Sequence, residues 1–298
     1  MSVNTDPDRI FKHFGKNKKS VEQDVRIISD WLETQGHLSE KAVDTMITHF
    51  LVNNNFSIEK TKQSLDMYYS IRTIMPEVFQ NTLPLSSATK DIYEELTVFP
   101  LPKLTPDLRR VIFFKCNGNP EKMNADKSLA LLSHINEVQI WEDLSLAEIY
   151  ILDYSNVKLG HLTKSPPQLF RKLDFIYEEV WNNKIKEIHV IKASKVAESL
   201  ISILRKCLYK ELREKIFVHS SLSEFYKFIP RDILPKEYGG EEKSINDLKE
   251  LWTETLLRHK SRFEKLESIV VQESQRPYSY KNCDILGYYG NYMKVDVS

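Results

Sequence analysis

The stretch Asp232–Gly240 reads DILPKEYGG, and residues 241–245 continue it as EEKSI. A proline, a tyrosine and two adjacent glycines follow one another here, in a chain with only 8 glycines among 298 residues. Glycine has no Cβ, so it allows a tight turn that other residues resist. The stretch therefore predicts a tight, sequence-specific turn.

Upstream of this turn, runs rich in β-branched and aromatic residues alternate with helical patterns. The strand-like runs are Arg110–Phe114, Glu148–Asp153, Glu187–Lys192 and Lys215–His219. Apolar residues recur at helical spacing between them, at Leu169, Leu173, Ile176 and Val180, and at Val196, Leu200, Ile203, Leu204 and Leu208. Strands joined by crossover helices predict an α/β fold with a largely parallel sheet.

The first part of the chain predicts a helical module instead. Apolar spacing between Val21 and Ile74 indicates three amphipathic helices, with Ser39 and Ser57 as N-caps and Pro76 ending the third. The four prolines of residues 83–106 indicate a connection with at most a short helix. After Ser244, which can form a capping box with Asp247, we expect a last helix. We expect a helical module over residues 1–85, an α/β domain over 86–262, and a helix end and tail over 263–298.

The composition is that of an ordinary globular chain, with 41% hydrophobic and 28% charged residues. Because 42 basic residues balance 42 acidic ones, no overall field favours nucleic acid or an anionic membrane. The basic bias of residues 1–20 indicates either a local charged contact or a solvated leader. Three separated cysteines indicate a reducing cytoplasm, and no apolar run approaches the roughly 20 residues of a membrane span.

Catalytic and metal-binding motifs are missing from the sequence. It contains no GxGxxG or GxxxxGKS/T phosphate loop, no GxSxG elbow, and no HExxH or paired Cys/His spacing. We therefore expect no enzymatic activity, no catalytic residues, no metal and no cofactor.

The stretch DILPKEYGG resembles the LPxEYGG segment that ends the lipid-binding domain of the CRAL-TRIO family. Three further segments resemble the family in the same order: FLVNNNFSIEKTKQSLDMYYSIR from Phe50, IYILDYSNVKLGHL from Ile149 and KIKEIHVI from Lys184. The similarity is greatest to tocopherol and retinoid carriers, some of which have a C-terminal extension like the segment from Asp284. It implies a helical bundle followed by a domain whose sheet and helices enclose a lipid cavity. The sequence departs from the family pattern in two places. Residues 50–55 stand where the family often has a basic FLRAR-like segment, and Lys192 and Ser194 stand where it has an Asn and a Pro.

The resemblance, with strand alternation, implies a set of cavity residues. On the sheet these are Tyr150, Leu152, Ile188 and Val190, and on the sides Leu159, Leu173, Ile176, Tyr177 and Trp181. A gate helix over about residues 195–208 would contribute Leu200, Ile203 and Leu204. The alternative is that this helix and these rings are ordinary core. A polar ligand group needs a partner, and His134 is the first candidate, with Tyr150 and Tyr177 as alternates; His134 is otherwise a satisfied core residue.

The resemblance also implies contact with phosphoinositides through Lys184, Lys186 and Lys215, with Arg213 beside them. The alternative is a solvated basic edge. The expected function is a cytoplasmic, transiently membrane-associated carrier of one tocopherol, retinoid, carotenoid or phospholipid molecule. The competing hypothesis is a regulatory or scaffold module that binds phosphoinositides or proteins without transferring cargo.

Overall fold

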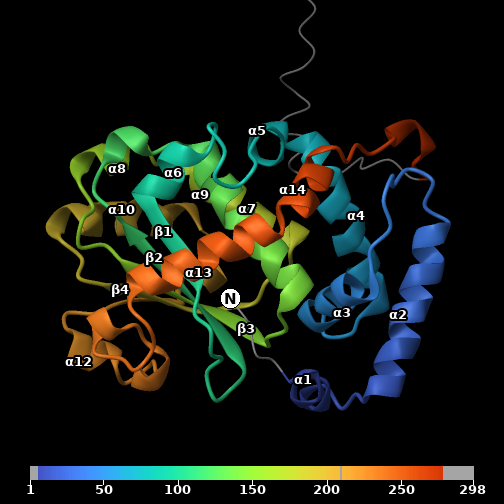
Figure 1. The fold of residues 1–298 in the computed structure, drawn as a ribbon, viewed down its shortest axis with the longest axis horizontal. Coiled ribbons are helices and arrows are strands. Elements are labelled where there is room, and N and C mark those ends of the chain that lie inside the picture. Colours follow the sequence, from blue (N-terminus) through green and yellow to red (C-terminus); the bar gives the residue numbers. More distant parts are fainter. Residues whose placement is uncertain (1–5, 209, 278–298) are drawn as a thin grey trace, which may run out of the picture.

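The computed structural model describes residues 6–208 and 210–277, with a helical region beside an α/β region (Figure 1). The helical region contains α1 (Pro7–His13), α2 (Lys18–Glu33), α3 (Asp44–Asn53) and α4 (Ile58–Ile74). The three helices expected between Val21 and Ile74 are therefore confirmed. The third ends before Pro76, which begins the short α5 (Pro76–Phe79), because proline cannot continue the helix that precedes it.

The two predicted N-caps of this region have different outcomes. Ser57 caps α4, since its side chain accepts the Lys60 N–H. The prediction for Ser39 is wrong, because α3 begins at Asp44 behind Val43, which makes no side-chain cap bond. The segment before α3 is not helical, and Glu40 within it forms an ion pair with Arg262 at 2.6 Å.

The connection predicted over residues 83–106 contains more structure than expected. Helix α6 (Lys90–Glu95) leads directly into strand β1 (Leu96–Pro100), which pairs antiparallel with β2 (Arg109–Cys116). The absence of β1 from the sequence prediction is an error. Pro100 at its end argued against a strand, but an edge strand accepts a proline because one side of it needs no ladder bonds.

Within the described residues, five strands form one sheet in the order β1-β2-β3-β4-β5. Strands β2, β3 (Ala147–Asp153), β4 (Ile185–Ile191) and β5 (Ile216–Val218) are mutually parallel, which confirms the mostly parallel α/β fold. The elements between these strands are η1 (Pro120–Lys122), α7 (Ala125–Glu142), α8 (Leu159–Thr163), α9 (Pro167–Phe175), the π-turn η2 (Ile176–Val180), α10 (Lys195–Cys207) and α11 (Lys210–Arg213).

The strand order explains which face of the sheet these helices cover. Each parallel connection moves to the next strand in the same direction, and such crossovers are right-handed, so the helices collect on one face. The other face is crossed by α13 (Ile245–Arg258), the long orange helix in front of the sheet in Figure 1. A space between sheet and crossover helices can therefore form on one side only.

The predicted turn at DILPKEYGG is confirmed, and it closes the face under α13. After the short elements α12 (Leu222–Phe225), η3 (Arg231–Ile233) and η4 (Lys236–Tyr238), Gly239 adopts φ +65°. A Cβ on Gly240 would lie 1.9 Å from the Leu234 carbonyl oxygen, so only glycine fits there. The turn presents Tyr238, whose hydroxyl donates to Asp153 at the end of β3 and whose ring lies 5.4 Å from that of Phe113.

The C-terminal helices return the chain to the helical region. Ser244 and Asp247 form the expected capping box of α13, and α14 (Lys260–Glu267) and η5 (Glu273–Gln275) follow. Arg276 then forms an ion pair with Asp66 of α4 at 2.7 Å. The expected boundary after residue 262 lies inside α14, and the segment from Asp284 lies outside the described residues.

Candidate ligand-binding cavity

An apolar cavity of about 140 Å³ lies between the sheet and its crossover helices. The sheet contributes residues of one face to the cavity wall. On the strands or directly after them, these residues are Leu96, Phe114, Cys116, Tyr150, Leu152, Tyr154, Ile185 and Ile188. Alternation along a strand sends every second side chain to the same face, so Tyr150 and Leu152 face the cavity while Ile151 faces away.

Helices α7, α8, α9 and α10 form the opposite wall. From α10 come Leu200 and Leu204, and Leu208 follows at the same spacing of four residues, which places the three on one stripe of the helix. Ser194 caps the start of α10 by accepting the Ala197 N–H. The other helices and their flanks contribute Met123, Ser128, Leu129, Leu132, His161, Ser165, Leu169, Phe170, Leu173, Asp174, Tyr177 and Leu212.

A pair of tyrosine hydroxyls forms one polar point on this wall. The hydroxyls of Tyr150 and Tyr177 are 2.6 Å apart, and Tyr150 donates to Glu148 at 2.8 Å. The amides of Gln139 and Asn183 also donate to the Glu148 carboxyl, at 3.0 and 3.1 Å. Burial raises the pKa of Glu148 to about 7, because an apolar surrounding disfavours the charged form. The two hydroxyls can therefore exchange hydrogen bonds with a ligand, and the Glu148 carboxyl behind them is about half ionised near pH 7.

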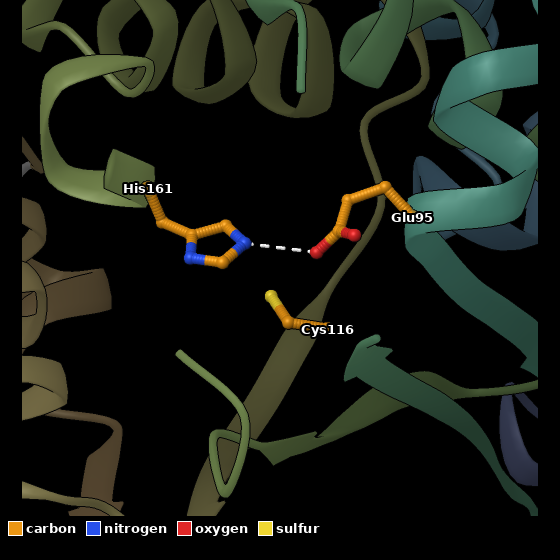
Figure 2. Close-up of side chains that lie close together, drawn as sticks. All are labelled: Glu95, Cys116 and His161. Atoms are coloured by element: carbon orange, nitrogen blue, oxygen red, sulfur yellow. Dashed lines mark hydrogen bonds and ion pairs between the residues drawn. The ribbon is translucent and has the colours of Figure 1, made fainter. Parts of the chain in front are cut away.

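A second polar point is formed by Glu95, Cys116 and His161, which Figure 2 shows pointing toward one another. His161 Nε2 lies 2.8 Å from Glu95 Oε1, and the Glu95 carboxylate also accepts the backbone N–H groups of Gly118 and Asn119. Burial raises the pKa of the Cys116 thiol to about 12. Glu95 and His161 are 66 positions apart in the chain, so the three residues meet only through the fold, and no short motif in the sequence indicates them.

The structure places seven of the thirteen expected ligand residues on the cavity wall. These are Tyr150, Leu152, Leu173, Tyr177, Ile188, Leu200 and Leu204. Their spacing on strands and helices was visible in the sequence. The wall also contains residues outside the expected set. These are Phe114, which alternation along β2 indicates, and Leu129 and Leu132 of α7, a helix that was not predicted from the sequence.

Six expected residues lie off this wall. Leu159 is 68% exposed at the start of α8. Val190 is fully buried in the packed core although it neighbours Leu152 in the strand register. Ile176 is buried within the π-helix η2, and Trp181 is buried directly after it. The wider winding of a π-helix changes which side chains face the sheet. Ile203 is only partly buried and packs beside the leucine stripe of α10.

His134, the first candidate for a polar ligand group, is the sixth of these residues. It lies on α7 and lines a separate small pocket with Phe79, Thr82 and Phe263. Its Nδ1 is 2.7 Å from the Tyr93 hydroxyl, and burial lowers its pKa to about 3. His134 is therefore a neutral, hydrogen-bonded core residue.

The four expected basic residues do not form one cluster. Lys184 is directed into the helical region, where its Nζ donates to Asn55 at 2.7 Å and to the Val52 carbonyl at 3.2 Å. Burial lowers its pKa to about 8, and the headgroup role of Lys184 stays a prediction. Lys186 and Arg213 are exposed, and Lys215 is half-buried.

The asparagines that stand where the family has basic residues join the same junction. Asn53 donates to Asn183 at 2.9 Å, Asn182 donates to Asn54 at 2.5 Å, and Asn55 accepts from Lys184. Three successive residues at the end of α3 thus bind three successive residues before β4. The replacement of the basic segment by FLVNNN fastens the helical region to the sheet.

Comparison with known proteins agrees with this arrangement. Residues 17–89 match the family model of a Pinta-like UBA domain, and residues 94–240 match that of the CRAL/TRIO domain. The chain contains a CRAL/TRIO domain. The CRAL/TRIO match spans β1 to Gly240, so it contains every strand of the described sheet and ends at the tight turn.

Relatives named alpha-tocopherol transfer protein-like resemble this chain over most of its length. Those of Homo sapiens and Pongo abelii are each 27% identical over 248 residues, which cover 82% of this chain and 71% of theirs. The Mus musculus protein is 26% identical over the same length. The crystal structure of Sfh5 aligns with a TM-score of 0.47 and 12% identity, covering 89% of this chain and 100% of that one.

No helix among the described residues is both long enough and apolar enough to cross a membrane.

Proposed function

We propose that this chain binds one hydrophobic molecule in the cavity and exchanges it at membranes. The observation that carries the proposal is the cavity itself, an apolar space of about 140 Å³ where a protein core is normally filled. The names of its relatives support a lipid of the tocopherol class, and a retinoid, carotenoid or phospholipid has the same apolar character. The proposal contains no catalytic step.

The size of the cavity implies that a lipid must widen it. An engineered cavity of about 150 Å³ binds benzene, so the present space suits one ring or a short tail. Widening the cavity costs the least free energy at an element that contacts the sheet through side chains alone. Helix α10 meets the wall through the stripe Leu200, Leu204 and Leu208, and we assign it as the gate that moves when cargo enters. Each buried CH₂ of the cargo gains about 0.8 kcal/mol.

Tyr150 and Tyr177 are the proposed partners of the polar end of the cargo. A hydroxyl left unpaired in an apolar cavity costs on the order of 1–3 kcal/mol. The tyrosine pair lies on the wall and connects to Glu148 behind it, so a ligand hydroxyl joins a network that is already hydrogen-bonded.

Membrane contact is the remaining part of the proposal. Lys186, Arg213 and Lys215 are accessible to a phosphoinositide headgroup, and we expect this contact in the cytoplasm. Charge-assisted bonds from lysine or arginine to phosphate would hold the protein at the bilayer while α10 opens.

Native mass spectrometry of the freshly purified full chain, followed by organic extraction, tests the carrier function. We expect one bound lipid per chain. Leu204→Trp fills the cavity and should abolish retention of that lipid, whereas Leu257→Trp, on a side chain that is 56% exposed on α13, should not. A wild-type protein that yields no lipid, or a Leu204→Trp protein that retains as much as wild type, refutes the carrier and favours a scaffold without cargo.

A further inference from the structure

Glu95, Cys116 and His161 come from three different elements and meet at the cavity wall. Glu95 ends α6, Cys116 ends β2 and His161 lies in α8. Their exposed fractions are 0%, 4% and 1%. One carboxylate oxygen, the thiol sulfur and one imidazole nitrogen all lie within 4.8 Å of one another. The fold thus gathers three kinds of metal ligand in a place from which water is excluded.

We propose that these three side chains bind a zinc-type divalent ion. A thiolate, an imidazole and a carboxylate together suit Zn²⁺, whereas Ca²⁺ and Mg²⁺ prefer oxygen ligands alone. In a tetrahedral zinc site the ligand atoms are about 3.3–3.8 Å apart. His161 Nε2 and Glu95 Oε1, at 2.8 Å, need to separate by about half an ångström. The adjustment is within the reach of side-chain rotation.

Hydrogen bonds from the backbone orient two of the three side chains, Glu95 and His161. His161 Nδ1 accepts the Lys158 backbone N–H at 2.9 Å, so the ring proton lies on Nε2, toward Glu95. Binding of the ion at Nε2 requires this proton to leave and Nδ1 to become protonated, and the Nδ1–H can then donate to the Lys158 carbonyl oxygen, 3.2 Å away. Glu95 receives the N–H groups of Gly118 at 3.0 Å and Asn119 at 2.7 Å, and each of its oxygens keeps a lone pair. Such outer hydrogen bonds fix ligand orientation in metal proteins. Cys116 loses its proton to solvent when the ion binds.

The open side of the site faces the cavity. Cys116 and His161 are themselves part of the cavity wall, and Glu95 lies behind them. Three protein ligands leave a fourth position on a tetrahedral ion, and here an oxygen atom of the cargo would fill it. This last consequence rests on the proposed function, whereas binding of the ion does not.

Cobalt replaces zinc and reports thiolate ligation by its charge-transfer absorption, so it tests the site in the full chain. After removal of metals, we expect one Co²⁺ per chain, a thiolate-to-cobalt band, and loss of that band when Zn²⁺ is added. Cys116→Ser should abolish the band, and the matched control Cys207→Ser with Cys283→Ser should retain it. His161→Gln should weaken Co²⁺ binding by about a hundredfold or more.

A wild-type protein without the band, or a band that survives Cys116→Ser, overturns the metal site. Circular dichroism of each variant shows whether it is folded, and the wild-type spectrum decides the question even if a variant does not fold. Decanoate should shift the visible cobalt bands, and decane should not; an intact band that decanoate leaves unchanged refutes the cavity-facing position. If the cobalt band is present in a protein from which no lipid can be extracted, the metal site stands and the carrier function is refuted.

Discussion

Phe113 and Phe114 are neighbours on β2, yet they meet opposite environments. Phe113 is fully buried, with the rings of Phe99 and Tyr238 each 5.4 Å away. Phe114 is half-buried and lines the cavity. The face under α13 is filled by rings and by the DILPKEYGG turn, whereas the face under the crossover helices contains a space. The same strands therefore provide a rigid support on one side and a binding site on the other.

The largest effect is expected from breaking the filled face at its turn. Gly240→Ala places a Cβ 1.9 Å from the Leu234 carbonyl oxygen and 2.4 Å from its carbon. Because backbone atoms cannot move aside cheaply, we expect a loss of at least about 4 kcal/mol in the free energy of unfolding. Urea denaturation measures it. Lys243→Ala, at a nearby exposed position, should stay within about 0.5 kcal/mol of wild type, and an equally small loss for Gly240→Ala would contradict the turn geometry.

The two phenylalanines sharpen the comparison directly. Phe113→Ala should cost about 3–5 kcal/mol, since it creates a cavity among packed rings. Phe114→Ala should cost about 1–2 kcal/mol, because its side chain already borders a space, but it should alter which lipids are extracted. Urea midpoints and lipid extraction of both variants provide the measurement. Equal losses of stability would show that the two faces are packed alike.

Glu148 makes the cavity side dependent on pH. Its pKa in the folded protein is about 7, above the ordinary value of 4.5, so between these values the folded state holds a proton that the unfolded chain has released. With respect to this group, the free energy of unfolding should therefore be highest below about pH 4.5, fall by about 3 kcal/mol as pH rises to 7, and level off above it. Denaturation midpoints across this range measure the decline. Glu148→Gln should remove it, and an unchanged decline would exclude Glu148 as its source.

The smallest effects concern two lysines at the start of β4, Lys184 and Lys186. Lys184→Ala should cost about 1 kcal/mol of stability, because it removes bonds to Asn55 and Val52. Lys186→Ala should leave stability within about 0.5 kcal/mol but weaken binding to phosphoinositide vesicles by about 1 kcal/mol. Thermal unfolding and vesicle sedimentation distinguish the two. Undiminished vesicle binding by Lys186→Ala would remove it from the membrane contact.

Prediction from the sequence was most successful where a pattern is local. The spacing of Tyr150 and Leu152 predicted a strand, and the spacing of Leu200 and Leu204 predicted a helix. Each spacing also predicted which face of the element lines the cavity. Strand β1 was missed because its signal is five residues long and ends in proline. The sequence left two roles open for His134, because a histidine on a buried helix suits a ligand cavity and a packed core equally, and its contact with Tyr93 arises only in the fold.

The sequence by itself determined the parallel α/β fold, the tight turn at Gly239 and Gly240, and the leucine stripe of α10, because periodicity and the special conformations of glycine act over a few residues. The tertiary structure alone decided which side chains border a space. It brought Glu95 to His161, and it engaged Lys184 and the asparagines of FLVNNN in a junction. Such contacts join residues as much as 132 positions apart, and no local pattern encodes a distance that arises only when the chain is packed.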